Sequence, residues 1–452
     1  MTESAIAAII LAAGQGTRMK SSLPKVLHKI AGREMIGHTM DAARALSPAT
    51  LVAVVGDNAD TIRTFVHAQT ADAKIAVQSP PRGTGDAVAQ ATPHLAGFSG
   101  VVLVLYADTP LITPQTLSAL VAGINDGASV AVLGFTPSDA GAYGRLKQDA
   151  DGSLAAIVEA REATPEELAI TLCNSGVMAF DAAFLTANIG ALSNDNAKGE
   201  YYLTDLVEIA RAHDKTCMIV EADLEEVIGV NSRVELAEAE AIFQKRRRIA
   251  AMEGGATLTD PQTVYFSFDT ELGRDVVVGA NVVFAPGVRV GDNCEIKPYS
   301  HLEGTIIGEG ASIGPFARLR PGAQINDGAK VGNFVEIKKA VIGDGAKVSH
   351  LTYIGDADIG ANANIGAGTI TCNYDGYSKH KTVIGAGAFV GSNSSLVAPV
   401  TIGNGAYVGS GSVITKNVDS GDLAVARGRQ AAIKGWAEKF HRTHEKKNEN
   451  ES

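Results

Sequence analysis

The sequence predicts a Rossmann-like α/β domain with a mainly parallel sheet, joined by a helix to a left-handed parallel β-helix of hexapeptide repeats. Three observations predict this fold: strand-like and helix-like segments alternate through the first 230 residues, an amphipathic segment follows, and an apolar residue then recurs at every sixth position. A chain of 452 residues is also longer than one hydrophobic core usually supports, which favours two or more domains.

The N-terminal part alternates apolar runs typical of strands with stretches compatible with helices. These segments are Ile6–Leu11, His38–Leu46, Leu51–Val55, Thr84–Ala91 and Val101–Tyr106. Such alternation predicts a parallel sheet with helices on both faces, and the ligands of such sheets bind at the carboxyl ends of the strands. The segment is large enough to bury its own core, so we expect residues 1–232 to form an autonomous, monomeric fragment.

Residues 232–253 are predicted to form a connecting helix. Ser232-Arg233-Val234-Glu235 has the sequence of a capping box, and apolar residues follow it at helical spacing. The domains are therefore expected at 1–231 and 254–452, with the helix between them. The charged and polar tail is expected to be disordered from about Lys439 onward.

From Val278 an apolar residue recurs every six positions, which indicates the stacked coils of a parallel β-helix. It stands at positions 278, 284, 290, 296 and 302, at 307, 313, 319, 325, 331 and 337, at 342, 348 and 354, at 359 and 365, and at 384, 390, 396, 402, 408 and 414. Each of these side chains points inward and stacks on the coil above, about 4.8 Å away. Thr371–Thr382 interrupts the repeats with a polar, Gly-containing stretch, which predicts a projecting loop.

Composition narrows the function and the compartment. A net charge of -11 argues against a nucleic-acid binder, which needs a basic face. The four cysteines lie far apart and form no C-x-x-C pair, which predicts neither a zinc site nor a disulfide framework and fits a reducing compartment. The apolar run Ile6–Leu11 is too short for a signal peptide or a membrane span. We therefore expect a cytoplasmic protein that binds no membrane.

The first strand runs into a Gly-rich loop suited to phosphates. Leu11-Ala12-Ala13-Gly14-Gln15-Gly16-Thr17-Arg18-Met19 is followed by Pro24-Lys25. Small residues let backbone N–H groups approach phosphates, and Arg18 and Lys25 supply positive charge. Met19 stands where a dinucleotide fingerprint needs its third Gly, and the G-K-[ST] ending of a P-loop is absent. The alternative is an ordinary Gly-rich turn between a strand and a helix, with no role in phosphate binding. The presence of Thr-Arg and then Pro-Lys at this spacing disfavours that alternative.

The second motif in this half is a carboxylate at a strand end. Val101–Tyr106 ends in Ala107-Asp108, and a carboxylate there is well placed for Mg²⁺, which prefers oxygen ligands and phosphate partners. Read alone, Asp108 could equally cap the helix that follows Pro110.

The pattern L-A-A-G-x-G-T-R-M…L-P-K resembles the signature of sugar-nucleotide pyrophosphorylases. With the β-helix, the chain up to about Trp436 resembles the bacterial family of bifunctional N-acetylglucosamine-1-phosphate uridylyltransferases and glucosamine-1-phosphate acetyltransferases. The resemblance implies acetyl transfer from acetyl-CoA to glucosamine 1-phosphate, then uridylyl transfer from UTP to N-acetylglucosamine 1-phosphate, feeding peptidoglycan and lipopolysaccharide precursors. It also implies Mg²⁺ and a homotrimer with sites between neighbouring β-helices.

The resemblance also implies the residues of the first site. Asp108 would bind Mg²⁺ together with Asn231, in Gly229-Val230-Asn231, while Arg18 and Lys25 would stabilise the triphosphate. Ala107 stands where the family usually has Gly. Gln78 and Gly83-Thr84 match the uracil-reading loop. The full set expected to bind nucleotide and sugar is Leu11, Ala12, Ala13, Gly14, Lys25, Gln78, Gly83, Thr84, Tyr106, Asp108, Gly144, Glu159, Asn174 and Asn231.

In the β-helix the informative residues are those that depart from the repeat's preference for small groups. Arg320 and Lys338 are cations suited to a sugar phosphate, and His350 lies between them and the loop that carries Asn373-Tyr374. By resemblance, Arg320 and Lys338 bind the phosphate of glucosamine 1-phosphate, and His350 is the general base for the amine. Tyr353, Asn364, Asn373 and Tyr374 would position the sugar.

By the same resemblance, acetyl-CoA would run along the coils near Ala367, Ser392 and Ser410, with Arg427 meeting a coenzyme phosphate. Ser410 stands where the family commonly has Ala. Alternatively, Ser392 and Ser410 are ordinary small residues of the hexapeptide repeat and have no role in binding.

Two single-activity alternatives stand beside this interpretation. The β-helix could serve only assembly or regulation of a nucleotidyltransferase, but a scaffold needs neither His350 nor the cations beside it. The β-helix could instead be the only enzyme, with a degenerate N-terminal domain, but Arg18, Lys25, Asp108 and Asn231 are all present.

Overall fold

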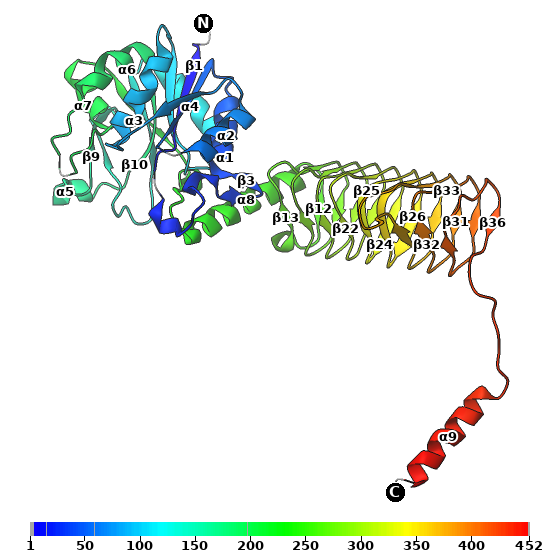
Figure 1. Ribbon diagram of the computed structural model, residues 1–452. Coiled ribbons are helices and arrows are strands. Elements are labelled where there is room, and N and C mark those ends of the chain that lie inside the picture. Colours follow the sequence, from blue (N-terminus) through cyan, green and yellow to red (C-terminus); the bar gives the residue numbers. More distant parts are fainter. Residues whose placement is uncertain (1–3, 15, 58, 197, 451–452) are drawn as a thin grey trace. The chain divides into compact units, whose positions relative to one another are not determined.

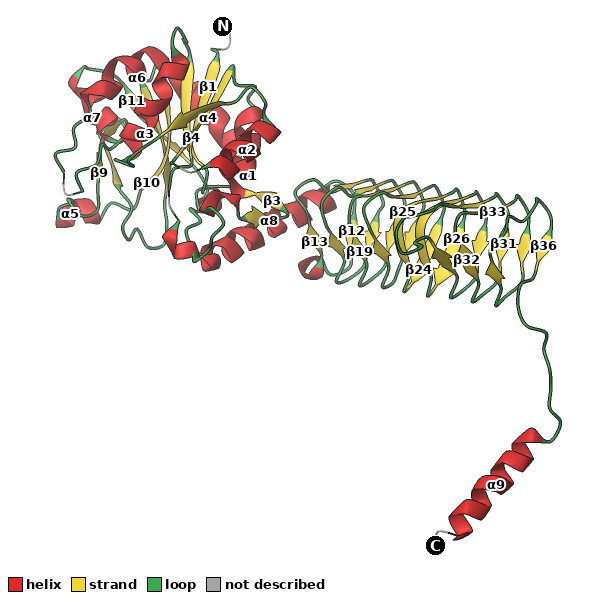
Figure 2. Cartoon of the chain, in the orientation of Figure 1, coloured by secondary structure: helices red, strands yellow, loops and turns green. Residues whose placement is uncertain are grey.

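The computed structural model describes residues 4–14, 16–57, 59–196 and 198–450, and the chain divides into two compact units (Figures 1 and 2). Gln15 of the Gly-rich motif lies outside the described residues. The first unit extends to Ala250 and includes Phe266–Phe268, and the second takes Ala251–Tyr265 and the chain from Asp269. This division differs from the predicted one, in which the first domain ends at residue 231.

The first unit is built on a mainly parallel sheet, which confirms the predicted fold class. Its strand order is β11-β7-β10-β6-β1-β4-β5, and β10 runs antiparallel to both of its neighbours. The strands are β1 (Ile6–Leu11), β4 (Thr50–Val55), β5 (Lys74–Val77), β6 (Val101–Tyr106), β7 (Val130–Phe135), β10 (Cys173–Asp181) and β11 (Cys217–Glu221). Strand β8 (Arg145–Gln148) pairs with β10, and β9 (Leu154–Val158) pairs with β8. A separate small sheet pairs β2 (Lys29–Ile30) with β3 (Arg33–Glu34).

Helices cover both faces of this sheet, as Figure 1 shows. They are α1 (Met35–Arg44), α2 (Asp60–Gln69), α3 (Thr84–Ala91), α4 (Pro114–Asn125), α5 (Pro165–Leu168), α6 (Ala182–Asn188) and α7 (Asp205–Ala212), with 3₁₀ turns η1 (Thr17–Met19), η2 (Lys25–Leu27), η3 (Thr92–Leu95), η4 (Ile189–Ala191) and η5 (Leu224–Glu226). Alternate residues of β1 enter opposite cores, with Ala8 and Ile10 in one and Ala7 and Ile9 in the other. A strand buried on both faces must be apolar throughout, which explains the unbroken runs in the sequence.

Strand register brings the predicted motifs to one edge of the sheet. Leu11, the last residue of β1, pairs with Tyr106, the last residue of β6. On the other side β1 pairs with β4, and Val55 at the end of β4 pairs with Val77 at the end of β5. The Gly-rich loop, Asp108 and Gln78 therefore all follow parallel strands at their carboxyl ends, where ligands of such sheets bind.

Helix α8 (Arg233–Glu253) belongs to the first unit as far as Ala250 and is therefore more than a free connection. Ala239 is fully buried against a cluster that contains Ile30, Met35 and Val230. The Glu240 carboxylate accepts a hydrogen bond of 2.7 Å from the Ala31 N–H. The sequence pattern predicts the helix but does not predict that it packs on this cluster, because its apolar stripe is short and is flanked by arginines.

The second unit is a parallel β-helix, and its stacked coils match the predicted left-handed form. Val278 pairs with Ile296, Ile296 with Ile313, and Ile313 with Val331, all in parallel and all buried. Two long sheets and their turns include η6 (Pro261–Thr263) and the strands β12 (Thr257–Leu258), β13 (Tyr265–Phe266), β14 (Glu271–Leu272), β15 (Val277–Val278), β16 (Val283–Phe284), β17 (Arg289–Val290), β18 (Glu295–Ile296), β19 (His301–Leu302), β20 (Thr305–Ile307), β21 (Ser312–Ile313), β22 (Arg318–Leu319), β23 (Ala323–Ile325), β24 (Lys330–Asn333), β25 (Glu336–Ile342), β26 (Lys347–His350), β27 (Tyr353–Ile359), β28 (Asn364–Ile365), β29 (Ile370–Cys372), β30 (Thr382–Ile384), β31 (Phe389–Val390), β32 (Ser395–Val397), β33 (Val400–Ile402), β34 (Tyr407–Val408), β35 (Val413–Ile414) and β36 (Leu423–Ala424).

The interruption at 371–382 forms a loop with its own hydrogen bonds. Asp375 accepts from the backbone N–H groups of Tyr377 and Ser378, at 2.8 and 2.6 Å, and its carboxylate meets His380 Nε2 at 2.7 Å. The backbone bonds and His380 hold the pKa of Asp375 well below its usual range. The loop is therefore shaped around one carboxylate.

The C-terminal tail differs from its prediction. Where disorder was expected from about Lys439, the structure has helix α9 (Trp436–Asn450). A charged tail buries little apolar surface, which predicts disorder, yet Glu, Lys and Arg also have high helix propensity. None of the helices within the described residues is both long enough and apolar enough to cross a membrane.

The packing of α8 changes the expectation for an isolated N-terminal fragment. Residues 1–232 would leave Ile30, Met35 and Val230 without their cover, and Asn231 without the Glu235 carboxylate that accepts its N–H at 2.7 Å. We expect this fragment to be on the order of 4 kcal/mol less stable in urea unfolding than residues 1–268. As a control, Ala239→Asp in the longer fragment should reproduce most of the loss. Equal stability of the two fragments would show that α8 adds nothing to this core.

Candidate active sites

The carboxyl edge of the first sheet holds a cavity of about 480 Å³. Twelve of the predicted residues line it: Leu11, Ala12, Ala13, Gly14, Lys25, Gln78, Gly83, Thr84, Tyr106, Asp108, Glu159 and Asn174. Gly144 and Asn231 lie outside this lining but contact residues within it. Arg18 is exposed and also lies outside the lining.

The Gly-rich loop is held against the strands on both sides. The Ala12 N–H donates to Val54 O at 2.8 Å, and the Ala107 N–H donates to Leu11 O at 3.0 Å. Gly16 has a φ of 61°, and a Cβ there would lie 2.5 Å from the Cβ of Lys25. Glycine at this position therefore lets the loop fold closely over Lys25.

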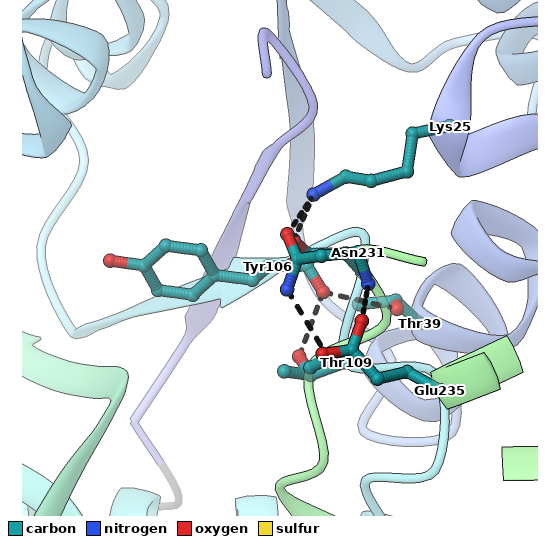
Figure 3. Close-up of polar contacts among 8 residues, drawn as sticks. Lys25, Thr39, Tyr106, Thr109, Asn231 and Glu235 are labelled. Atoms are coloured by element: carbon teal, nitrogen blue, oxygen red, sulfur yellow. Dashed lines mark hydrogen bonds and ion pairs between the residues drawn. The ribbon is translucent and has the colours of Figure 1, made fainter. Parts of the chain in front are cut away.

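Lys25 lies where the two predicted metal ligands converge. Its ammonium makes an ion pair with the Asp108 carboxylate and donates to Asn231 Oδ1 at 3.0 Å, and Figure 3 shows it reaching toward Asn231. Lys25 is 8% exposed, so this cation is nearly enclosed. Two oxygen atoms that hold one cation have the chemistry that Mg²⁺ requires, with phosphates and water completing its shell. The residues present therefore fit the metal.

Backbone contacts fix both of these ligands. The Val230 N–H donates to Asp108 O at 2.8 Å, and the Asn231 N–H donates to the Glu235 carboxylate at 2.7 Å. The carbonyl of Tyr106 accepts from the hydroxyls of Thr39 and Thr109, at 3.3 and 2.9 Å, which holds the end of β6 (Figure 3). Ala107 is fully buried, so its methyl packs in the core where the family usually has Gly.

The predicted sugar-binding residues lie close together, with Gly144 just before β8, Glu159 just after β9 and Asn174 on β10. The Asn174 N–H donates to Gly144 O at 2.8 Å, and its Oδ1 accepts from the Gly176 N–H at 2.9 Å. Gly176 has a φ of 89°, and a Cβ there would approach the Tyr106 ring to 3.0 Å. Burial raises the pKa of Glu159 and that of Tyr106. This end of the cavity is therefore partly shielded from solvent and rich in hydrogen-bonding groups.

One stretch of the lining was missed from the sequence. Lys198, Glu200, Tyr202 and Thr204 also face the cavity. Asp205 follows them, and burial together with nearby carboxylates raises its pKa to about 6. The only available signal was a cluster of charged and aromatic residues in a segment without periodicity, just before a helix.

The second candidate site lies on the β-helix. Arg320 Nη1 contacts the Glu336 carboxylate at 2.7 Å. The neighbouring Lys379 ammonium, followed by the charge of Arg320, lowers the pKa of Lys338. Cations that crowd in this way favour an anion between them, as expected for a sugar phosphate. Glu336 and Lys379 were not among the predicted residues, although Lys379 falls in the predicted loop.

His350 stacks directly above a polar partner. It pairs in register with Asn333, one coil earlier, and its Nδ1 lies 2.6 Å from Asn333 Oδ1. An amide oxygen can only accept, so Nδ1 carries the proton and Nε2 is left to accept one. Asn333 was missed, although coil-to-coil spacing in the repeats could have pointed to it.

The predicted sugar-positioning residues fall on neighbouring coils and the loop. Tyr353 stacks on Glu336, and Asn364 stacks on Lys347. Asn373 Nδ2 donates to the Asp356 carboxylate at 2.5 Å, whereas Tyr374 is exposed on the loop. The structure thus places these residues on neighbouring coils of the β-helix and on its loop.

The predicted acetyl-CoA residues form a column along the coils. Ala367, Ser392 and Ser410 each come two residues after Ile365, Val390 and Val408, which stack in register. Arg427 Nη1 donates to Ser410 O at 2.7 Å, which ties the end of the column to its last coil.

Comparison with known proteins agrees with both halves. Residues 8–144 match the MobA-like NTP transferase domain, and residues 269–304, 304–339 and 381–416 match bacterial transferase hexapeptide repeats. The "Bifunctional protein GlmU" of Paramagnetospirillum magneticum is 56% identical over 97% of this chain and 97% of that protein. The chain belongs to the GlmU family. The GlmU proteins of Azorhizobium caulinodans and Rhodospirillum rubrum are 55% and 56% identical, over 97% and 96% of this chain and 97% of each relative.

Membership of the GlmU family makes the chain a bifunctional transferase. The predicted nucleotidyltransferase and the predicted hexapeptide-repeat transferase are both confirmed. The two single-activity alternatives are accordingly set aside.

Proposed function

We propose that this chain makes UDP-N-acetylglucosamine in two steps at two sites. The β-helix transfers an acetyl group from acetyl-CoA to glucosamine 1-phosphate, and the α/β unit then joins the product to UTP with release of pyrophosphate. The observation that carries the proposal is the convergence of Lys25, Asp108 and Asn231 at the mouth of the cavity, in a GlmU-family chain whose repeats carry His350 and crowded cations.

Uridylyl transfer depends on alignment and charge more than on covalent catalysis. The phosphate of the sugar attacks the α-phosphorus of UTP, and pyrophosphate leaves. Backbone groups of residues 11–14 and the Lys25 ammonium would bind the triphosphate, while Glu159 and Asn174 would orient the sugar. Mg²⁺, held by Asp108 and Asn231, would neutralise phosphate charge.

Lys25 has a second part in this proposal. In the ligand-free chain its ammonium balances the charge of the partly buried Asp108 carboxylate. When a triphosphate arrives, the flexible lysine side chain can move to it and leave both oxygen ligands to the metal. The exposed Arg18 would add positive charge at the outer end of the same loop.

Acetyl transfer needs a neutral amine, and His350 Nε2 would take its proton. The amine nitrogen then bonds to the thioester carbon, the carbon–sulfur bond breaks, and coenzyme A leaves as the thiol. Arg320 and Lys338 would hold the phosphate, Tyr353, Asn364, Asn373 and Tyr374 would position the sugar, and acetyl-CoA would lie along Ala367, Ser392, Ser410 and Arg427. Asn333 keeps the His350 tautomer that leaves Nε2 free to act.

A homotrimer would complete this second site. Tyr299, Phe316 and Phe334 stack on successive coils, with ring centroids 4.9 and 5.1 Å apart, and each is about half exposed. Leu351 is also exposed and adjoins His350. An apolar column of this kind is stabilised by contact with another surface. A second copy on it would bring further groups to His350.

The proposed compartment is the cytoplasm. UTP and acetyl-CoA are intracellular metabolites, and all four cysteines are free thiols, as expected in a reducing compartment. The product would supply peptidoglycan and lipopolysaccharide synthesis.

Asp108→Asn should separate the two activities. A neutral amide holds Mg²⁺ far less well than a carboxylate, so UTP-dependent pyrophosphate release should fall by more than about 100-fold. Thiol release from acetyl-CoA should stay near wild type. The exposed Asp126→Asn is the control and should change neither activity. Loss of both activities in folded Asp108→Asn protein would argue against separate sites.

His350→Ala should lower kcat for acetyl transfer by ~10²–10⁴-fold and spare uridylyl transfer. Asn333→Ala should cost about 10–100-fold in the same step, because it removes the partner that orients the base. Asn333→Asp should move the acid limb of the rate profile to higher pH, since a carboxylate favours the protonated imidazole. Lys347→Ala on the same strand is the control. Wild-type kcat in His350→Ala would mean that another group is the base.

Phe334→Glu should break the proposed trimer. A carboxylate buried in an apolar contact is strongly unfavourable, so the variant should sediment as a monomer and lose at least about tenfold in acetyl transfer. Tyr407→Glu is a matched control, because Tyr407 also stacks on an exposed ring, Phe389, away from this column. A Phe334→Glu variant that sediments as wild type would exclude the column as the interface.

A further inference from the structure

The amide of Gln78 is held in one orientation at the floor of the cavity. Its Nε2 donates to Gly83 O at 2.9 Å and to Asp86 Oδ2 at 2.8 Å. Gln78 is 4% exposed and Asp86 is 7% exposed. A backbone carbonyl and a carboxylate are both acceptors, so both must face the NH₂ group. The carbonyl oxygen of Gln78 is the group that remains for a ligand.

Asp86 is itself anchored at its other oxygen. Oδ1 accepts from Arg82 at 3.2 Å and from Gln90 at 3.4 Å. Asp86 lies in the first turn of α3, where a helix favours negative charge. The carboxylate is therefore held in position, and it opposes any flip of the Gln78 amide that would bring two oxygen atoms together.

Gly83 provides the second fixed acceptor. Its φ is 104°, and a Cβ there would lie 2.5 Å from Tyr201 O. The loop that contains Gly83 can therefore approach the backbone at Tyr201 this closely only with glycine at position 83. The amide of Gln78 thus lies between the carbonyl of a closely packed backbone turn and a carboxylate that is itself hydrogen-bonded.

We infer that Asp86 is a positioning residue that sets base specificity through Gln78, an inference that rests on the proposed use of UTP. With its NH₂ group engaged, Gln78 offers a base only an acceptor. Uracil presents an N–H at N3 and satisfies it. Cytosine presents a lone pair at N3, so two acceptors would face each other at a side chain that is only 4% exposed. A buried group left unpaired in this way is what rejects a near-isostere.

The test is the ratio of kcat/KM for UTP to that for CTP. Wild type should prefer UTP by at least about 100-fold. Asp86→Asn should lower this ratio by at least about tenfold, because an amide can donate to a flipped Gln78 and removes a charge-assisted hydrogen bond. Asp86→Glu keeps an acceptor-only group and should retain more of the ratio than the isosteric Asn variant. General damage to the domain would slow both nucleotides alike and leave the ratio unchanged.

Asp60→Asn is the matched control, since Asp60 also lies in the first turn of a helix but is exposed. It should leave the ratio at the wild-type value. Direct binding of UTP and CTP to folded variants gives the same comparison without turnover. A wild type without preference for UTP would overturn the proposed first activity. A wild-type preference that survives unchanged in Asp86→Asn would overturn the role of Asp86 alone.

Discussion

The first site depends on one ionic contact, that of Lys25 with Asp108 and Asn231. It joins three segments that are far apart in the sequence: the turn after β1, the end of β6 and the start of α8. Lys25 is largely buried and Asp108 is partly buried, so the ammonium is shielded from water and is stabilised by the opposite charge beside it. The position of α8 is therefore a requirement of the site, because its first turn fixes Asn231 through Glu235.

The second site is ordered by a different constraint, the stacking of coils. Each residue of a parallel β-helix lies above the equivalent residue of the preceding coil, so a side chain is positioned by its neighbour in register. His350 is oriented by Asn333 in this way, and Tyr353 lies above Glu336, the partner of Arg320. The spacing of the repeats can therefore place the proposed base and the proposed phosphate-binding cation beside their supporting groups.

The sequence predicts a structural feature well where a residue type in a given pattern has a single common role. The hexad of apolar residues predicts stacked coils, and a carboxylate after a buried strand predicts a place at the sheet edge, where Asp108 lies. Residues that act through a partner were not predictable in the same way. Asn333 is one polar residue among many on the repeats, and Asp86 looks like an ordinary first-turn acid until its contact with Gln78 is known.

The boundary of the first domain could not be predicted for a similar reason, because it depends on how a helix packs. Helix α8 was predicted as a helix, but the pattern does not say against what its apolar residues pack. The two sites have one feature in common. In each, a proposed functional side chain is held in place by a neutral or charged neighbour from its own unit. Gln78, Asn231 and Lys25 are held inside the first unit, and His350 inside the second. Among the described residues, the contacts that fix these side chains come from their own unit, so the two activities can be combined in one chain with separate catalytic groups.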